Sequence, residues 1–302
     1  METIESLRRK IVVTEDLREV VKTMKTLAAV SIRQYEKAVE SLRQYSRTVE
    51  MGMQVVLHNS HKNSVQPPPA AGGRLGAIIF GSELGMCGQF NELIVSHALD
   101  EFQKLQVGQG NRSIIAVGDR ALSRLEEAGE KVEAYFAVPG SLSGITSRVQ
   151  EILLKIEAWQ GPGGVERIIL FHHQLISGAV FRPQTIPLLP LDLDWLENLR
   201  QRPWPSRILP TYTMARPRLL YALLGQHLFV SLYRAFAESL ASENASRLAS
   251  MQAAESHIEE QLKELRLQYN QQRQSTITEE LMDIVAGFEA LAGGNTDTRG
   301  KE

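Results

Sequence analysis

The C-terminal quarter of the chain, residues 217–291, constrains the fold more than any other stretch. It has no proline after Pro217 and no glycine between Gln226 and Ala286, so nothing in it interrupts a helix. From Met251 onward its apolar residues recur in steps of three and four, as in the seam of a coiled coil. These residues are Met251, Ala254, Ile258, Leu262, Leu265, Tyr269, Ile277, Leu281, Ile284, Phe288 and Leu291. A helix of about 75 residues would be on the order of 110 Å long, and its seam needs a partner.

A second long helix is predicted over residues 1–58, at the N-terminus. This stretch has no proline, and its first glycine is Gly52. Its apolar residues also step mostly by three and four, at Ile4, Leu7, Ile11, Leu17, Val20, Met24, Leu27, Tyr35, Ala38, Leu42, Tyr45 and Val49. The charged residues between them are expected to form solvated faces. The two helices therefore provide the apolar seams that each other requires.

The region between the helices has a different pattern, in which short apolar runs alternate with amphipathic segments. Strands are predicted at 75–80, 113–117, 132–138, 167–175 and 178–189, and helices at 90–105, 119–128 and 143–159. This alternation is typical of an α/β domain with a mainly parallel sheet. The last two strands are close enough in sequence to form an antiparallel hairpin.

Two linkers and a tail complete the domain organisation. Residues 59–74 and 191–216 are rich in proline or glycine and are predicted to be irregular, and residues 293–302 are expected to be disordered. The predicted fold is a Rossmann-like α/β domain, residues 75–190, inserted between two helices, 1–58 and 217–292. Because the chain leaves along one helix and returns along the other, the pair forms a long antiparallel α-helical coiled coil.

The two predicted helices differ in length, which leaves one end without a partner. Both are attached to the α/β domain at the same end, so about 19 residues, 272–291, extend past the N-terminal helix. These residues still carry an apolar stripe, and an exposed stripe of this kind marks an interaction surface. The alternatives are that the N-terminal helix extends further along its partner, or that the tip frays.

Composition and motifs provide little support for catalysis or for nucleic-acid binding. The formal net charge of −2 gives no bias toward nucleic acid or anionic membrane, and no run approaches the ~18 apolar residues of a membrane span. Cys87 is the single cysteine, so no intramolecular disulfide is possible. His172 and His173 fall on opposite faces of a predicted strand, which favours structural roles. We expect no catalytic, cofactor or metal site.

The segment after the first predicted strand, GSELGMCGQFN at residues 81–91, occupies the position of a dinucleotide-binding loop. Its glycines are spaced G-x-x-x-G-x-x-G, which is not the nucleotide fingerprint. We expect a tight strand-to-helix turn with glycines at positive φ. The motif residues are Gly81, Ser82, Gly85, Cys87, Gly88, Phe90 and Asn91. A nucleotide-binding α/β enzyme is the alternative that this strand, turn and helix leave open.

A polar run interrupts the C-terminal seam at residues 270–276, NQQRQST. Seven polar residues cover about two helical turns, so part of the run faces the direction in which the seam was apolar. It is either a solvated stretch or a set of hydrogen-bonding groups for a surrounding partner. Arg273 has the planar donor fork that suits carboxylates, and Gln274 and Thr278 can both donate and accept.

Taken together, these segments resemble the gamma subunit of F-type ATP synthases. The resemblance is carried by SLASENASRLASMQAA and LQYNQQRQSTITEELMDIVAG in the C-terminal helix, by GSELGMCGQFN and by IPLLPL at 186–191. The N-terminal IESLRRKI and VVKTMKTLAAVSIR fit as well. It covers essentially the whole chain. Lys25, Thr26, Glu83 and Met86 depart from residues common in the family, which is consistent with a divergent or alternate F-type ATPase.

The resemblance implies a rotary shaft that couples ion flow to ATP synthesis or hydrolysis and has no catalytic site of its own. The coiled coil would stand in a ring of alpha and beta subunits, and the α/β domain would sit with an epsilon subunit on a membrane c ring. The protein would then be peripheral, on the cytoplasmic or equivalent organellar face. A static coiled-coil scaffold is the competing interpretation.

The resemblance also assigns site residues. Arg273, Gln274, Thr278 and Glu280 would contact the alpha–beta ring through polar groups, and Ile277, Leu281, Ile284 and Phe288 would form an apolar bearing inside it. Arg8, Lys10, Met24 and Lys25 are the corresponding candidates on the N-terminal helix. No cofactor and no nucleic-acid partner is implied.

Overall fold

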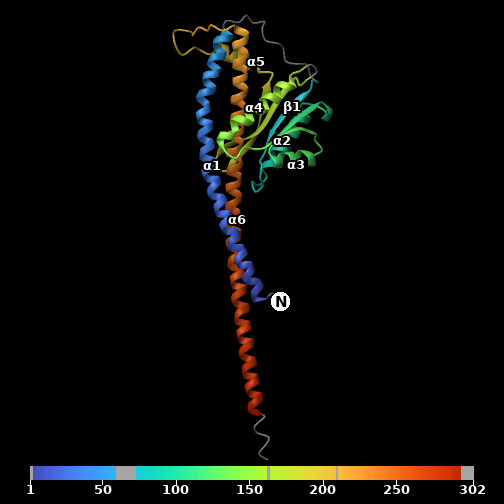
Figure 1. Cartoon of the computed structure of the whole chain (residues 1–302), viewed down its shortest axis with the longest axis vertical. Helices are drawn as coiled ribbons and strands as arrows, with labels where there is room; N and C mark the ends of the chain where they lie inside the picture. Colours follow the sequence, from blue (N-terminus) through green and yellow to red (C-terminus); the bar gives the residue numbers. More distant parts are fainter. Residues whose placement is uncertain (1–2, 59–72, 162–163, 209, 294–302) are drawn as a thin grey trace, which may run out of the picture. The chain divides into compact units, whose positions relative to one another are not determined.

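The computed structural model describes residues 3–58, 73–161, 164–208 and 210–293 (Figure 1). The chain divides into two compact units, Met1–Lys25 with Met251–Glu302, and Thr26–Ser250. Two long helices, α1 (Ile4–His58) and α6 (Arg216–Gly293), contribute to both units. Their bounds agree closely with the two predicted helices. The predicted tail and nearly all of the first linker lie outside the described residues.

The first unit is a pair of antiparallel helices. Lys25 of α1 forms an ion pair with Glu255 of α6, and Glu15 forms one with Arg266 at 2.6 Å. From the first ion pair to the second, the residue number falls by ten on α1 and rises by eleven on α6, so the two helices run in opposite directions. Between the helices lies an apolar cluster of Val21, Met251, Ile258 and Leu262, flanked by Ile11, Met24 and Ala254. Here the structure agrees with the predicted antiparallel pairing.

The seam of α1 differs from the predicted one. Leu17, Val20 and Leu27 were expected in the seam, yet they are 50%, 55% and 63% exposed. As far as Val49, the buried positions are spaced by multiples of seven residues: Leu7, Thr14, Val21, Ala28, Tyr35 and Val49; from Met53 to Leu57 every side chain is buried. A strict period of seven is the signature of a left-handed coiled coil. The hydroxyl of Thr14 is satisfied inside its own helix, where it donates to the carbonyl oxygen of Lys10 at 2.7 Å.

The second unit contains a five-stranded sheet of order β3-β2-β1-β4-β5. The strands are β1 (Leu75–Phe80), β2 (Arg112–Val117), β3 (Val132–Phe136), β4 (Arg167–Ser177) and β5 (Val180–Leu189). Strands β1 to β4 pair in parallel, and β4 and β5 form an antiparallel hairpin. The helices between them are α2 (Phe90–Lys104), α3 (Asp119–Glu127) and α4 (Leu142–Trp159), with a short 3₁₀ turn at Gln109–Asn111. The α/β prediction is confirmed.

Helix α6 belongs to the core of this unit because it covers one face of the sheet together with α4. Side chains of that face, such as Phe80, pack with Leu232, Phe236 and Leu240 of α6. Phe80 and Phe236 meet edge to face, with ring centroids 4.7 Å apart. The opposite face is covered by α2 and α3 through an apolar cluster that includes Phe102.

The second linker, 191–216, was predicted to be irregular but contains a helix. Helix α5 (Leu193–Gln201) begins after Asp192, whose carboxylate accepts from the backbone N–H of Asp194 at 2.9 Å. This is an N-cap, which stabilises the first turn. Leu199 of α5 is buried against Val49 and Met53 of α1. The prolines that suggested an irregular segment all lie after α5.

Candidate partner-binding surface

The C-terminal part of α6 extends past the first residue of α1 as an unpartnered helix. Glu15 of α1 pairs with Arg266 of α6, and α1 begins eleven residues before Glu15, at Ile4. Because the helices are antiparallel, Ile4 lies level with the residue eleven positions after Arg266, which is Ile277. The described side chains of residues 277–289 are all exposed, whereas Tyr269, Gln272 and Thr276 are half-buried. The overhang therefore begins about five residues later than the predicted residue 272, because α1 extends further along α6. The backbone remains helical to Gly293.

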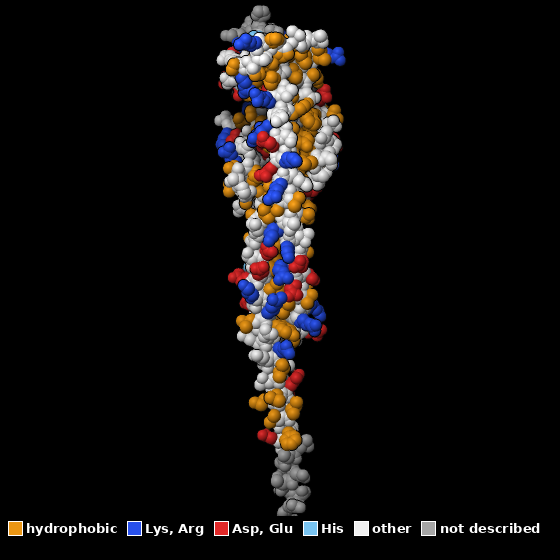
Figure 2. All heavy atoms as spheres, turned by 90° about the vertical axis from the view of Figure 1, so that its left-hand side faces the viewer, with side chains coloured by type: hydrophobic (Ala, Val, Ile, Leu, Met, Phe, Trp, Pro, Cys, Tyr) orange, Lys and Arg blue, Asp and Glu red, His pale blue; other side chains and the backbone are white. Residues whose placement is uncertain are grey.

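Large apolar side chains line this overhang, as Figure 2 shows over the last described turns of α6. Ile277, Leu281, Ile284 and Phe288 are 52%, 59%, 69% and 74% exposed. Their steps of four, three and four place them on one helical face, and Met282 and Val285 widen the stripe. A surface of this kind is uncommon on a monomer and marks a site that a partner covers.

The polar run at residues 270–276 stays helical. The side chains of Arg273, Gln274, Thr278 and Glu280 are all exposed, just before and at the start of the apolar overhang. The hydroxyl of Thr278 donates to the carbonyl oxygen of Gln274 at 2.8 Å, so towards a partner it can act only as an acceptor. The structure thus brings the polar and apolar candidates of α6 together on neighbouring turns.

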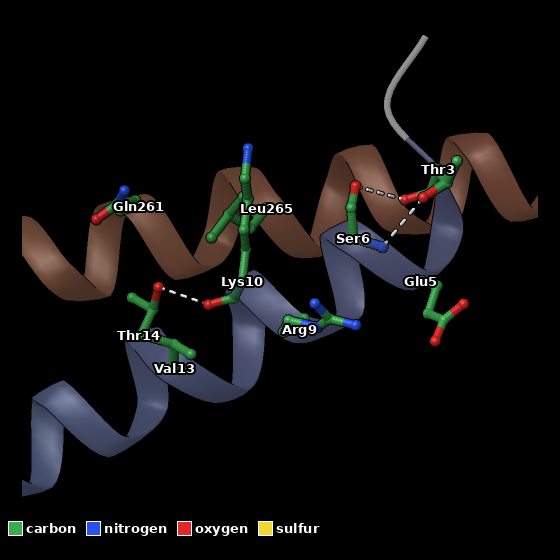
Figure 3. Close-up of a pocket in the computed structure, with 9 residues that line it drawn as sticks. All are labelled: Thr3, Glu5, Ser6, Arg9, Lys10, Val13, Thr14, Gln261 and Leu265. Carbon is green, nitrogen blue, oxygen red and sulfur yellow. Dashed lines mark hydrogen bonds between the residues drawn. The ribbon is translucent and has the colours of Figure 1, made fainter.

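A groove of about 680 Å³ lies where the first turns of α1 meet α6 (Figure 3). Thr3, Arg9, Lys10 and Val13 line it from α1 and the residue before it, and Leu265 lines it from α6. The remaining lining residues are Glu5, Ser6, Thr14 and Gln261. The groove combines basic side chains with an apolar floor, which suits a partner segment that is itself amphipathic.

The four candidates on α1 separate into two groups. Lys10 lines the groove, and Arg8 is exposed but does not line it. Met24 packs with the cluster around Val21, and Lys25 forms its ion pair with Glu255. Met24 and Lys25 therefore serve the helix pair itself, so they do not share a surface with Arg8 and Lys10.

The turn between β1 and α2 holds itself together through a short network. The side-chain oxygen of Asn91 accepts from the backbone N–H of Ser82 at 2.9 Å, and its NH₂ donates to the Ser82 hydroxyl at 2.8 Å. That hydroxyl donates to the carbonyl oxygen of Leu84 at 2.8 Å. Cys87 is buried beside them, and burial raises the pKa of its thiol. A buried thiol with a raised pKa is a poor nucleophile.

The prediction that the glycines of the turn adopt positive φ holds for only one of them. Gly88 has a positive φ of 56°, as expected, but Gly81 and Gly85 do not. A Cβ at Gly81 would lie 2.5 Å from the Cβ of Ala121 and 2.6 Å from the Asn91 side-chain oxygen. Gly81 is therefore required for close packing. The second positive φ of the turn belongs to Met86, at 61°.

Side chains of α6 donate hydrogen bonds to the backbone of the same turn. The hydroxyl of Ser246 donates to the carbonyl oxygen of Cys87 at 2.6 Å, and Arg247 reaches the carbonyl oxygens of Leu84 and Gly85 at 3.4 and 3.5 Å. Arg247 also forms an ion pair with buried Glu243 at 2.5 Å. These contacts show that the motif joins the turn after β1 to α6, and nothing in its geometry favours a nucleotide site.

Both histidines of β4 are buried and bonded, in agreement with the structural interpretation. Nε2 of His172 lies 2.8 Å from Oε2 of Glu238, and the other carboxylate oxygen, Oε1, accepts from Nε–H of Arg234 at 2.6 Å. Burial would raise the pKa of Glu238, but hydrogen bonds from His172 and Arg234 outweigh it and hold that pKa below its ordinary value. Nε2–H of His173 donates to the carbonyl oxygen of Phe90 at 2.8 Å.

The polar residues on the buried face of α6 were missed by sequence reasoning. Glu238, Ser242, Glu243 and Ser246 are all buried where α6 meets the sheet and the turn. The signal that could have revealed them is the run SLASENAS, in which small and polar residues replace the large apolar residues of the flanking helix. Small side chains allow close approach, and buried polar ones need partners.

The described part of the chain offers neither a metal site nor a membrane span. It contains no group of three or more His, Cys, Asp or Glu side chains placed to hold a metal ion. Within those residues, no helix has the length and hydropathy that crossing a membrane requires.

Comparisons with known proteins agree with this arrangement. A family model described as ATP synthase matches residues 3–291. The ATP synthase gamma chain of Cupriavidus metallidurans is 27% identical over 290 residues, covering 94% of this chain and 98% of its own. That of Chlorobaculum tepidum is 28% identical over 300 residues, covering 96% and 99%.

Solved structures show the same fold. The structure titled Euglena gracilis mitochondrial ATP synthase, OSCP/F1/c-ring, in rotational state 3, contains a chain similar to this one with a TM-score of 0.64. It is 16% identical, and the match covers 99% of this chain and 98% of that one. A chain from the rotor of the same enzyme in rotational state 1 gives a TM-score of 0.63 at 15% identity, covering 91% and 98%. The chain belongs to the gamma-subunit family of F-type ATP synthases.

Proposed function

We propose that this chain is the central rotary shaft of an F-type ATP synthase, turning inside a ring of alpha and beta subunits as ions flow through a membrane c ring. The observation that carries the proposal is the unpartnered end of α6. It remains helical, carries a continuous apolar stripe and has no partner within the described chain. A helix of this kind is complete only inside a socket made by other chains.

The tip of α6 acts as the bearing and the turns before it carry directional contacts. Ile284 and Phe288 are the most exposed large side chains of the stripe, so they lie against the sleeve of the ring. Arg273, Gln274 and Glu280 offer hydrogen bonds and charge that change partners as the shaft turns. Apolar contact is non-directional and tolerates rotation, whereas hydrogen bonds require specific geometry.

The α/β domain, residues 75–190, and the adjoining ends of both helices sit with an epsilon subunit on the c ring. The protein is then peripheral on the cytoplasmic or equivalent organellar face, and it reaches the membrane through its partners. It has no catalytic site of its own, since the buried titratable groups of the domain serve the fold. The chemistry belongs to the alpha–beta ring.

Reconstitution tests this function. Alpha and beta subunits are assembled with and without the full chain, and ATP hydrolysis and ring assembly are measured. We expect both turnover and assembly to depend on the chain. Unchanged turnover and unchanged assembly without it would contradict the proposal.

A reversible cross-link separates a shaft from a static scaffold. The Ile284→Cys variant is joined by a disulfide to a cysteine placed in one beta subunit. Cys87 is 2% exposed and does not compete. A shaft loses multi-site turnover when cross-linked and recovers it on reduction. A scaffold would retain its turnover in both states.

A further inference from the structure

The guanidinium of Arg247 lies between a buried carboxylate of α6 and the turn after β1. One of its nitrogens, Nη2, donates to Glu243 at 2.5 Å and also reaches the carbonyl oxygens of Leu84 and Gly85 at 3.4 and 3.5 Å. The other, Nη1, lies 3.5 Å from the side-chain oxygen of Asn244. The side chain of Arg247 is only 13% exposed. The position of this planar donor group therefore depends on the acceptors around it.

Glu243 is the acceptor that holds this guanidinium in place. Its contact with Nη2 is short and joins opposite charges, whereas the two contacts with the turn are long and have neutral acceptors, so they are weak on their own. Glu243 is 5% exposed, and within the described residues Arg247 is the only cation that pairs with it. Since a buried charge without a partner is costly, each member of the pair keeps the other in position.

The other titratable groups near Glu243 do not stabilise its negative charge. Tyr35 of α1 contributes a buried phenol, and the turn after β1 contributes the carboxylate of Glu83 and the thiol of Cys87. Burial raises the pKa of Glu243 above the ordinary value of a glutamate, Arg247 offsets only part of that rise, and the charge of Glu83 adds to it. The carboxyl group of Glu243 therefore takes up a proton more readily than an exposed one.

We propose that Glu243 and Arg247 form a proton-sensitive latch, which releases the turn after β1 when the surrounding pH falls. While Glu243 is a carboxylate, it holds the guanidinium against the carbonyl oxygens of the turn. Proton uptake removes the negative charge, so the guanidinium loses its counterion in a poorly hydrated site and turns to solvent. Its bonds to the turn are then lost. The bond from Ser246 to Cys87 does not titrate, so the turn loosens without detaching from α6.

The release is local and is not a first step of unfolding. Because the pKa of Glu243 is raised in the folded chain, the folded chain binds this proton more strongly than the unfolded chain, in which a glutamate titrates near ~4.3. Proton uptake at this group therefore increases the free energy of unfolding as the pH falls through the raised pKa. A looser turn within an intact fold is thus the observation that distinguishes the latch from acid unfolding.

A nitroxide spin label at Leu84→Cys reports the mobility of the turn in the full-length chain. Leu84 is 65% exposed and accepts a label without disturbing the core, whereas Cys87 is 2% exposed and should stay unlabelled, which wild type treated with the same reagent checks. Electron paramagnetic resonance spectra are recorded from about pH 8 to pH 5, a range in which a buried glutamate titrates. Circular dichroism at each pH confirms the intact fold. We expect the label to become at least twofold more mobile, and unchanged mobility would overturn the latch.

Three variants of the labelled chain, each with wild-type helicity, assign the effect. Glu243→Gln has the shape of the protonated side chain, so its label should be mobile already at pH 8 and insensitive to pH. Arg247→Gln removes the guanidinium and should give the same result. The matched control is Glu238→Gln, because Glu238 is the other buried glutamate of α6 but pairs with Arg234 and His172. It should keep the pH profile of the labelled parent. That profile in Glu243→Gln or Arg247→Gln, or its loss in Glu238→Gln, would refute the latch.

Discussion

The hydroxyl of Ser246 donates a hydrogen bond of 2.6 Å to the carbonyl oxygen of Cys87, 159 residues earlier in the chain. Both groups are buried, and the bond joins the turn after β1 to the middle of α6. Arg247 adds two longer bonds to the same turn. The glycine-containing motif after β1 is thus explained by a contact with a helix that is remote in sequence.

Replacing the Ser246 hydroxyl tests how much this hydrogen bond contributes to the stability of the fold. Ser246→Ala leaves the carbonyl oxygen of Cys87 with only the longer hydrogen bond from the backbone N–H of Phe90, at 3.3 Å, and we expect the free energy of unfolding to fall by about 1 kcal/mol. Chemical denaturation followed by circular dichroism measures the change. Ser231→Ala is the control, because the Ser231 hydroxyl donates to His227 within its own helix. A loss no larger than the control's would show that the bond does not stabilise the fold.

The buried imidazole of His173 predicts a loss of stability in mild acid. Burial lowers its pKa to about 4, whereas an unfolded histidine titrates near ~6.5. Above that value both states are neutral. Between the two values the unfolded chain binds the proton and the folded chain does not, so the free energy of unfolding falls as the pH falls. The loss approaches about 3 kcal/mol at the lower end of the window.

The measurement is the free energy of unfolding against pH for wild type and His173→Gln. Glutamine does not titrate, and its NH₂ can still donate to the carbonyl oxygen of Phe90. We expect the variant to have a flatter profile between about pH 6.5 and 4. His257→Gln, at an exposed position of α6, is the matched control for the loss of one histidine. Parallel profiles for wild type and His173→Gln would assign the acid sensitivity to other groups.

The tip of α6 should be dispensable for the fold of the isolated chain and required for assembly. Ile284→Asp combined with Phe288→Asp places charges at side chains that are 69% and 74% exposed. Helicity and unfolding of the free chain should change little, because exposed positions contribute within about 0.5 kcal/mol. Assembly with alpha and beta subunits should weaken at least tenfold, since charges would enter an apolar socket. Lost helicity in the free chain would instead place these residues in its own core.

The register of the coiled coil predicts that two apolar residues of α1, four positions apart, contribute very differently to the free energy of unfolding. Val21 is 6% exposed, and Val21→Ala should reduce the free energy of unfolding by about 1–2 kcal/mol. Leu17 is 50% exposed, and Leu17→Ala should change it by less than about 0.5 kcal/mol although more atoms are removed. Thermal unfolding followed at the helical circular dichroism band measures both. The reverse order of costs would support the seam that apolar spacing alone predicts.

The architecture could be predicted from the sequence because its signals are local. Uninterrupted periodic stretches specified α1 and α6, and the alternation between them specified the sheet, its hairpin and its helices. The seam of α1 was harder, because Thr14 and Ala28 occupy seam positions without being large apolar residues. Counting apolar residues therefore selected Leu17 and Leu27, which lie on another face.

The candidate surface was predicted in outline and corrected in detail. Unequal helix lengths correctly indicated an unpartnered end of α6, but its start at Ile277 depends on the register between Glu15 and Arg266, which spacing within either helix does not specify. The role of the turn after β1 depends on Ser246 and Arg247, which are remote in sequence. A long-range hydrogen bond leaves no periodic pattern, so it had to come from the structure.

Helix α6 is at once a long helix and a layer of the α/β core, since Phe236 and Leu240 fill the interior against the sheet. The sheet packs directly against this part of the helix, so a load on the domain reaches α6 through side-chain contacts as well as through the linker 191–216. A twisting load applied to the sheet has to shear close-packed side chains before the domain can slip around α6. The sheet and this part of α6 are therefore expected to turn together as one rigid unit.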